Sequence, residues 1–546
     1  MSAVPVLDVK GLRVALPAGS DRPFALDGID LTVNSGEIVC LVGESGSGKS
    51  LAAGAVMRLL PEPHVRVTDG TIRLEGQDLS HLTETQMRGI RGHRMAMIFQ
   101  EPMTALNPQK TVGWQIDEVL RLHTDLSRRD RRARAIEMLE RVKIPDPASA
   151  VNAHPHQVSG GQRQRVMIAM ALAMEPRLVI ADEPTTALDV TTQLQILRLI
   201  RELQESQGSG VLFITHDFGV VAEIADRVAV LRRGELVEQG PAEEVLNRPR
   251  HPYTRALIAS VPGLTPPPAR SFEGAPEVLK AEGMLKTFKA RGGFFSGRRE
   301  AVTAVDRISF DLRRGETLGV VGESGSGKTT VSRCVTRLLQ ADGGRAELDG
   351  RDILGAGARE LRAMRRDIQM VFQDPMASLN PRKRVVDLIA QGPIVHGAEP
   401  EAARAKAKEL LALVELSPSA AERYPHEFSG GQRQRIGIAR ALALEPKVIV
   451  ADEPVSALDV SVQAQVLKLL AELRERLDLS LLFVTHDLRV AAQLCDRVAV
   501  MEKGRIVEMA ETAALFADPQ HAYTRKLLGS IPGRDWTPPV IAEHAA

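Results

Sequence analysis

The strongest constraint on this chain is that it repeats itself once over most of its length. Three segments carry the repeat: GESGSGK at 43–49 and 322–328, SGGQRQR at 159–165 and 429–435, and ADEP at 181–184 and 451–454. They occur in the same order in both copies, with offsets of 270 to 279 residues. An offset this long indicates two copies of a whole domain and not a solenoid of short repeats.

Proline and glycine mark the boundary between the two copies. The stretch Pro262–Pro276 contains three consecutive prolines and cannot continue a helix. We therefore predict a first domain over residues 1–265, a Pro/Gly-rich linker over 266–276 and a second domain over 277–546.

Short apolar runs alternate with helical patterns in each copy, which is typical of a mostly parallel sheet covered on both faces. Segments rich in Leu, Ala, Arg and Glu, at 102–158 and 375–428, predict a helical insertion in each copy. The predicted class is α/β, with tandem domains that each have a mostly parallel sheet core and a helical insertion subdomain. The predicted strands are Ile38–Val42, Leu178–Ala181, Val211–Thr215, Leu318–Val321, Val448–Ala451 and Leu481–Thr485.

Composition excludes several classes of protein. Lysine plus arginine is 70 and aspartate plus glutamate is 69, so the net charge of +1 lacks the basic footprint of sequence-independent nucleic-acid binding. No stretch reaches eighteen uninterrupted apolar residues, and Met1–Lys10 does not have the pattern of a signal peptide. Three scattered cysteines favour a reducing compartment. Any role at a membrane is therefore expected to depend on a partner.

A glycine-rich segment with a lysine and a hydroxyl follows the first apolar run of each copy. Both fit G-x4-G-K-[ST], in which glycines let backbone N–H groups converge on phosphate oxygens at a helix N-terminus. Lys49 and Lys328 can then reach the β- and γ-phosphates, and the hydroxyls of Ser50 and Thr329 can bind Mg²⁺. The predicted residues are Gly43, Glu44, Ser45, Gly46, Ser47, Gly48, Lys49 and Ser50, and Gly322, Glu323, Ser324, Gly325, Ser326, Gly327, Lys328 and Thr329.

Two acidic residues end a hydrophobic strand in each copy, in LVIADE and VIVADE. The first acid, Asp182 or Asp452, is predicted to hold the magnesium shell. The second, Glu183 or Glu453, is predicted to orient and polarise the attacking water. Beside a phosphate loop, such a pair indicates nucleotide hydrolysis and not a merely solvated strand end.

At the SGGQ segments the chain resembles the ATP-binding-cassette ATPases, and the resemblance covers essentially the whole sequence. It implies signature motifs, Q-loop glutamines that also face Mg²⁺, D-loops and switch histidines. The residues that match are Ser159, Gly160, Gly161 and Gln162 with Ser429, Gly430, Gly431 and Gln432 (signature), Gln100 and Gln373 (Q-loop), Ala187–Asp189 and Ala457–Asp459 (D-loop), and His216 and His486 (switch).

The resemblance implies two nucleotide sites that hydrolyse ATP, each built from the phosphate loop of one half and the signature of the other. Both halves lie on one chain here, so the implied head-to-tail pairing is intramolecular. The family usually stacks an aromatic residue on adenine. Phe288 can do so in the second half, whereas Leu12–Leu16 in the first half has no aromatic residue.

Two further pairs of segments resemble importers of the dipeptide, oligopeptide and nickel class: QEPMTALNP with QDPMASLNP, and HPYT with HAYT. The fused arrangement is similar to the ATPases of Yej-type peptide importers, which also take up microcin C. This implies an ATPase subunit at the cytoplasmic face of the bacterial inner membrane. Its partners would be two transmembrane permeases and, through them, a periplasmic or extracellular binding protein. No cysteine lies near the HPYT segments, so no iron–sulfur cluster is expected.

The sequence is also compatible with two alternatives. One is a soluble tandem cassette protein acting on ribosomes or DNA, although the short linker and the lack of zinc-binding cysteines count against it. The other is an importer of nickel or another solute of the same class. For the importer, residues such as Met103, Leu106, Met376 and Leu379 are expected near an apolar socket for the permeases; packing inside the insertion is the competing interpretation.

Overall fold

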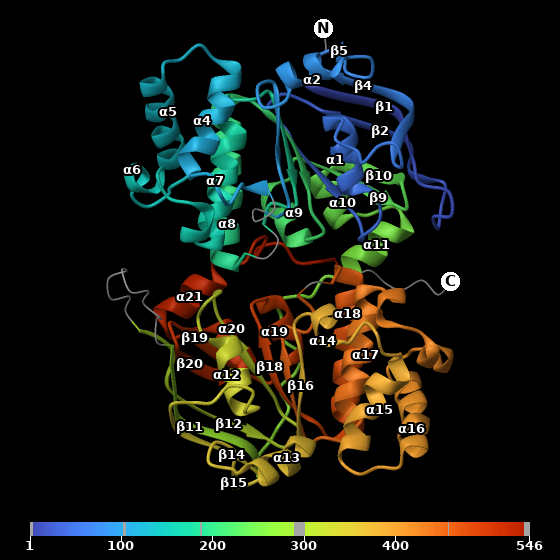
Figure 1. Cartoon of the computed structure of the whole chain (residues 1–546), viewed down its shortest axis with the longest axis vertical. Helices are drawn as coiled ribbons and strands as arrows, with labels where there is room; N and C mark the ends of the chain where they lie inside the picture. Colours follow the sequence, from blue (N-terminus) through green and yellow to red (C-terminus); the bar gives the residue numbers. More distant parts are fainter. Residues whose placement is uncertain (1–3, 102–104, 186–187, 289–300, 457, 540–546) are drawn as a thin grey trace. The chain divides into compact units, whose positions relative to one another are not determined.

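The computed structural model describes residues 4–101, 105–185, 188–288, 301–456 and 458–539. It divides into two units, one formed by Met1–Val261 with Pro532–Ala546 and the other by Pro262–Ile531. Each unit has the same kinds of layers (Figure 1).

Unit 1 is built on a six-stranded sheet with the order β10-β9-β3-β8-β7-β6. Its strands pair in parallel except β10, which is antiparallel to β9. The three strands predicted in this half are confirmed within a residue or two, because fully apolar runs can be buried on both faces of a sheet. The strands are β3 (Ile38–Val42), β6 (Met95–Ile98), β7 (Leu178–Asp182), β8 (Gly210–Ile214), β9 (Arg227–Arg232) and β10 (Glu235–Pro241).

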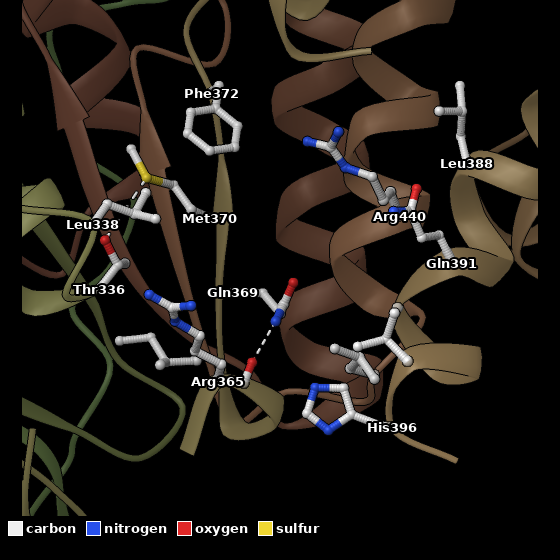
Figure 2. Close-up of a pocket in the computed structure, with 14 residues that line it drawn as sticks. Thr336, Leu338, Arg365, Gln369, Met370, Phe372, Leu388, Gln391, His396 and Arg440 are labelled. Atoms are coloured by element: carbon white, nitrogen blue, oxygen red, sulfur yellow. Dashed lines mark hydrogen bonds between the residues drawn. The ribbon is translucent and has the colours of Figure 1, made fainter. Parts of the chain in front are cut away.

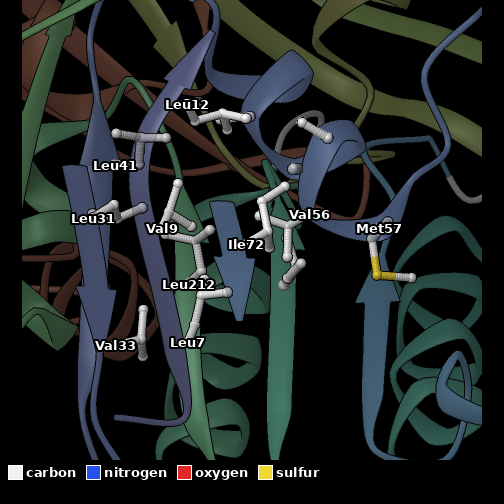
Figure 3. Packing of buried hydrophobic residues seen from close by; sticks show 14 of the residues in the cluster. Leu7, Val9, Leu12, Leu31, Val33, Leu41, Val56, Met57, Ile72 and Leu212 are labelled. Atoms are coloured by element: carbon white, nitrogen blue, oxygen red, sulfur yellow. The ribbon is translucent and has the colours of Figure 1, made fainter. Parts of the chain in front are cut away.

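A second, antiparallel sheet with the order β2-β1-β4-β5 completes the core of unit 1. Leu7, Val9 and Ile72 on this sheet pack in one buried cluster with Leu41 of β3 and residues of helix α1 (Figure 3). The helix that follows the phosphate loop is therefore fixed by both sheets. The elements are β1 (Leu7–Ala15), β2 (Phe24–Val33), β4 (Arg66–Leu74), β5 (Gln77–Asp78) and α1 (Lys49–Met57).

The predicted helical insertion is confirmed in unit 1. It lies between β6 and β7 and ends with α7, which leads back to the core. Its helices are α4 (Val112–His123), α5 (Arg128–Arg141), α6 (Pro147–Ala150) and α7 (Gly160–Leu172), with the 3-10 turn Pro155–Gln157. The other helices of the unit are α2 (Glu84–Ile90), α8 (Val190–Gln207), α9 (Phe218–Ile224), α10 (Ala242–Asn247) and α11 (Pro252–Ala259).

Unit 2 repeats this plan, with a six-stranded sheet ordered β16-β17-β18-β13-β19-β20 and a four-stranded sheet ordered β12-β11-β14-β15. Its strands are β11 (Glu277–Phe288), β12 (Val302–Arg313), β13 (Thr317–Val321), β14 (Gly343–Leu348), β15 (Arg351–Asp352), β16 (Ile368–Val371), β17 (Val448–Asp452), β18 (Ser480–Thr485), β19 (Arg497–Glu502) and β20 (Arg505–Glu511). Its helices are α12 (Lys328–Val335), α13 (Ala358–Asp367), α14 (Pro375–Ser378), α15 (Val385–Val395), α16 (Pro400–Leu413), α17 (Gly430–Leu442), α18 (Val460–Leu477), α19 (Leu488–Leu494), α20 (Thr512–Ala517) and α21 (Ala522–Leu528).

The segment that follows α11 packs within unit 2, where Gln493 Nε2 donates to the carbonyl oxygens of Gly263 (2.9 Å) and Thr265 (2.8 Å). The segment that follows α21 packs within unit 1, where the Gly533 N–H donates to Glu223 at 3.0 Å. The spatial units therefore differ at their edges from the sequence domains, whose boundaries stay a prediction. In the part of the chain that the structure describes, no helix is long and apolar enough to cross a membrane.

Candidate active site

The phosphate loops lie between β3 and α1 in unit 1 and between β13 and α12 in unit 2. The last glycine of each loop has a left-handed backbone, with φ of 112° at Gly48 and 107° at Gly327. A side chain at Gly48 would lie 2.6 Å from the carbonyl oxygen of Ala25, and one at Gly327 would lie 2.1 Å from that of Ala304. Both the conformation and the close approach require glycine here.

The loop lysines are almost fully buried, at 6% exposure for Lys49 and 5% for Lys328. Lys49 Nζ donates to the carbonyl oxygens of Gly43 at 2.7 Å and Glu44 at 2.9 Å. Lys328 makes the equivalent bonds in unit 2. Each ammonium group therefore lies over its own loop, at the N-terminus of the following helix, where an anion is favoured.

The hydroxyl that follows each lysine contacts the first acid of the strand end. Ser50 Oγ donates to Asp182 Oδ1 at 3.1 Å, and Thr329 Oγ1 donates to Asp452 Oδ1 at 3.2 Å. Burial raises the pKa of both aspartates, against the lowering effect of these hydrogen bonds. A hydroxyl and a carboxylate held this close are the oxygen donors that Mg²⁺ uses beside phosphate, so these residues fit a magnesium ion.

The second acid of each strand end forms a three-residue cluster. Glu183 accepts a hydrogen bond from Gln100 Nε2 at 2.9 Å and lies 3.1 Å from Nδ1 of His216. The residues that matched the Q-loop, the catalytic acid and the switch histidine thus meet around one carboxylate, although Gln100 and His216 lie 116 residues apart in sequence.

The same cluster is present in unit 2. Gln373 Nε2 donates to Glu453 Oε2 at 2.8 Å, and His486 Nδ1 lies 3.2 Å from the same oxygen. Glu183 and Glu453 have φ of 44° and 46°, a left-handed backbone that is uncommon outside glycine. Such strained positions concentrate at functional sites, where the surroundings hold a side chain in a required direction.

In the unit 2 cluster, the charges and the hydrogen bond between Glu453 and His486 act on the pKa of each residue in the opposite direction to burial. Burial by itself would raise the pKa of Glu453, but the hydrogen bond and charge of His486, with the charge of Lys328, lower it overall. Burial would likewise lower the pKa of His486, but Glu453 raises it overall. The pair therefore favours an ionised carboxylate beside a protonated imidazole.

The signature serines begin the last helix of each insertion. Ser159 caps α7 by accepting from the Gln162 N–H at 3.3 Å, while Gln162 Oε1 accepts from the Ser159 N–H at 2.9 Å. Ser429 and Gln432 form the same capping box on α17. Ser159 and Ser429 are exposed. Each signature is therefore an exposed helix N-terminus of a kind that can bind an anion.

Not every predicted residue has the expected surroundings. Leu106 and Leu379 are each only 2% exposed, so they pack inside the insertions and the socket prediction is wrong for them. Met376 is 50% exposed, and Met103 lies outside the described residues, as do Ala187 and Ala457 of the D-loops. Phe288 is 44% exposed at the end of β11, so its ring remains accessible.

Two tyrosines outside the predicted site reach the phosphate loops. Tyr253 and Tyr523 come from the HPYT and HAYT segments, and each hydroxyl lies within hydrogen-bond distance of the residue that follows the first loop glycine. The recurrence of the segment in both halves was a signal for a shared role. The spacing of the segments alone could not show that they contact the phosphate loops.

Comparison with known proteins identifies the family. A family model described as ABC transporter matches residues 26–186 and 305–456. The chain belongs to the ABC transporter family. A second model, described as the C-terminal region of oligopeptide/dipeptide transporters, matches residues 237–304 and 507–538, which include the two tyrosine segments.

Full-length relatives agree with this assignment. The chain is 48% identical to the glutathione import ATP-binding protein GsiA of Escherichia coli strain K12, over 96% of this chain and 89% of the relative. It is 47% identical to the protein of the same name from Salmonella paratyphi A, over 97% of this chain and 90% of that relative.

Among solved structures, a dimeric bacterial ABC transporter cassette is 29% identical over 43% of this chain and 98% of its own length, with a TM-score of 0.39.

The predicted fold class and the predicted activity are confirmed. The chain is a tandem ABC ATPase of the oligopeptide/dipeptide class that binds ATP and couples its hydrolysis to import. An import ATPase of this kind works with permease and substrate-binding partners.

The charge relation in the second cluster predicts a shift in pH dependence. With His486→Gln, burial of Glu453 is no longer opposed by the imidazole, so the pKa of Glu453 rises and the carboxylate protonates at a higher pH. The acid limb of ATP hydrolysis against pH should move upward in the purified protein. His81→Gln, at an exposed histidine far from the site in sequence, is the matched control. An acid limb at the same pH in His486→Gln and wild type would contradict this explanation.

Proposed function

We propose that this ATPase lies at the cytoplasmic face of a bacterial inner membrane and energises the uptake of glutathione or other short peptides into the cell. The observation that carries the catalytic part is the duplicated cluster of glutamine, glutamate and histidine beside a phosphate loop. The observation that favours glutathione is the identity of 48%, over nearly the whole chain, to ATP-binding proteins of glutathione import.

In this proposal each residue type has one role. Lys49 and Lys328 neutralise phosphate charge, and the glutamates at 183 and 453 orient the attacking water and draw its proton. His216 and His486 hold those carboxylates in place, and Gln100 and Gln373 contact them from the insertion side. Mg²⁺, when bound by Ser50 and Asp182 or by Thr329 and Asp452, would supply charge neutralisation at the phosphates.

We also propose that both sites hydrolyse ATP. Every contact described around Glu183 has a counterpart around Glu453, at distances that differ by about 0.1 Å. By family resemblance, each site would be completed by the signature of the other half, in a head-to-tail arrangement. That arrangement, and the domain boundaries at 265 and 277, rest on the sequence.

Two alternatives to glutathione belong to the same importer class. Yej-type peptide import is the first alternative, because the fused arrangement, with RLLPEPHV at 58–65, resembles that group. Import of nickel or another solute of the class is the second. The translocation path and binding protein are expected on other chains, so the ATPase itself does not encode the choice.

A groove in unit 2 supports permease docking at a place different from the predicted socket. It has a volume of about 430 Å³ and lies between β16 and helices α15 and α17. Met370 and Phe372 line one side, and Leu388 and Arg440 line the other (Figure 2). Phe372 directly precedes Gln373, so an occupant of this groove would act on the Q-loop glutamine that contacts Glu453.

The substrate proposal predicts which solute is transported. Co-expressed with its permease pair and binding protein, the ATPase should support uptake of labelled glutathione, and excess unlabelled glutathione should compete. A tripeptide of unrelated sequence and nickel serve as comparison solutes. Uptake of nickel or of longer peptides without uptake of glutathione would transfer the assignment to one of the alternatives.

The catalytic proposal predicts that Glu183→Gln and Glu453→Gln each retain ATP binding and lose hydrolysis at their own site. Loss of one preorganised transition-state contact costs about 10²–10³ in rate, so the double variant should be nearly inactive. ATP binding and phosphate release are measured on the same preparations. A single variant with the wild-type rate of transport would show that its site is dispensable, and a double variant with full hydrolysis would remove the role altogether.

The docking proposal predicts that Val395→Asp, which places a charge in the groove, uncouples the ATPase from its permeases. Val395 lines the groove and is 50% exposed, so the change should leave folding and ATP binding intact. Leu477→Asp is the matched control, because Leu477 is 42% exposed at the end of α18 and does not line the groove. Co-purification with the permeases is the measurement. Equal recovery of the complex for both variants would argue against docking at this groove.

A further inference from the structure

The HPYT and HAYT segments bring a tyrosine to each phosphate loop. The Glu44 N–H donates to the hydroxyl oxygen of Tyr253 at 3.3 Å, and that hydroxyl lies 3.3 Å from Oε2 of the same glutamate, to which it donates. In unit 2 the Glu323 N–H donates to the hydroxyl of Tyr523 at 3.2 Å. About 200 residues of sequence separate each tyrosine from its loop, yet the contact forms in both halves.

Other residues of the segment hold the tyrosine in this position. His251 begins α11, and its Nδ1 accepts from the Tyr253 N–H at 3.2 Å. The N–H of His251 itself donates to Glu238 of β10 at 3.1 Å. In unit 2, His521 caps α21 in the same way and donates to Glu508. The histidine therefore fixes the first turn of its helix, and the tyrosine two residues after it reaches the phosphate loop.

The loop residue that the tyrosine contacts is also the one that the catalytic lysine contacts. The Glu44 carbonyl oxygen accepts from Lys49 Nζ at 2.9 Å, while the N–H of the same residue donates to Tyr253. Glu323 is held between Lys328 and Tyr523 in the same manner. The peptide group between Gly43 and Glu44 carries both the N–H that donates to Tyr253 and the Gly43 carbonyl oxygen, which accepts from Lys49 Nζ at 2.7 Å. The tyrosine therefore holds a peptide plane that the lysine also contacts.

The surroundings of the hydroxyl keep it a neutral hydrogen-bonding group. Burial raises the pKa of Tyr253 to about 12, so the phenol remains protonated at physiological pH. The Arg232 guanidinium lies 5.0 Å from the centre of its ring. Tyr523 is only 7% exposed. Neither ring needs to move for its hydroxyl to meet the loop.

We propose that Tyr253 and Tyr523 are positioning residues for the two phosphate loops. Each hydroxyl fixes the backbone of the second loop residue, and so holds the loop in the shape that receives the nucleotide phosphates. The role rests on ATP binding at these loops. It would also give the C-terminal segment of each half a function in the nucleotide site, beyond that of a surface turn before a terminal helix.

Tyr253→Phe and Tyr523→Phe test the proposal, singly and together, in the full-length protein. Each removes only the hydroxyl and leaves the packed ring. Loss of one hydrogen bond to a partly buried backbone group should raise the Kd for ATP and for ADP about five-fold at the affected site. The KM for ATP should rise with little change in kcat, because the loop contacts phosphate in the ground state and the transition state alike.

Tyr424→Phe is the matched control, because Tyr424 is the third of the three tyrosines and lies in the helical insertion. Hydrogen exchange of peptides covering the phosphate loops gives a second readout, which should increase in Tyr253→Phe and Tyr523→Phe and not in Tyr424→Phe. A lower melting temperature with unchanged Kd, KM and loop exchange would reduce the tyrosines to a structural role and overturn the proposal. Failure of the wild-type protein to bind ATP would instead refute the proposed nucleotide site itself.

Discussion

One edge of each parallel sheet determines where the chemistry can occur. The strands β3, β6, β7 and β8 run in the same direction, so their carboxyl ends meet at that edge. The residues that follow these ends are the phosphate loop, Gln100, Glu183 and His216. Loops at the carboxyl ends of parallel strands are the general position of ligand sites in open α/β sheets. Loss of the parallel pairing would separate all four groups at once.

The site could be predicted from the sequence because its residues occur in short segments at strand ends. Lys49 follows its strand after six residues and Asp182 ends its strand, so strand prediction alone places both at the sheet edge. The meeting of Gln100, Glu183 and His216 followed from the family resemblance, and the geometry agrees with it. The exact hydrogen bonds depend on the order β3-β8-β7-β6, which spacing alone does not determine.

Other parts of the fold could not be predicted. In β1 the alternation of buried and exposed residues is broken near Gly11, where the pairing with β2 shifts register, so the antiparallel sheet gave no clear period-two signal. Leu106 and Leu379 lie within proline-flanked segments and were expected near a partner surface, but both side chains are only 2% exposed. The groove is formed by residues from β16, α15 and α17, and no contiguous sequence segment contains them.

The two halves agree on the phosphate side of the site and differ on the adenine side. In unit 2 the ring of Phe288 is 44% exposed, with Lys286 Nζ 5.6 Å from its centre, and an exposed aromatic ring is suited to stacking on a base. In unit 1 the stretch Leu12–Leu16 has no aromatic residue, and the aromatic residue nearest to it in sequence is Phe24. The centre of the Phe24 ring lies 5.3 Å from the guanidinium carbon of Arg13. Leu16 is partly buried against the core and offers only an apolar edge. The phosphate side is alike in the two halves because the same backbone groups, lysine, hydroxyl and acidic side chains make its contacts, whereas the adenine side has an exposed aromatic ring in unit 2 and a partly buried leucine in unit 1.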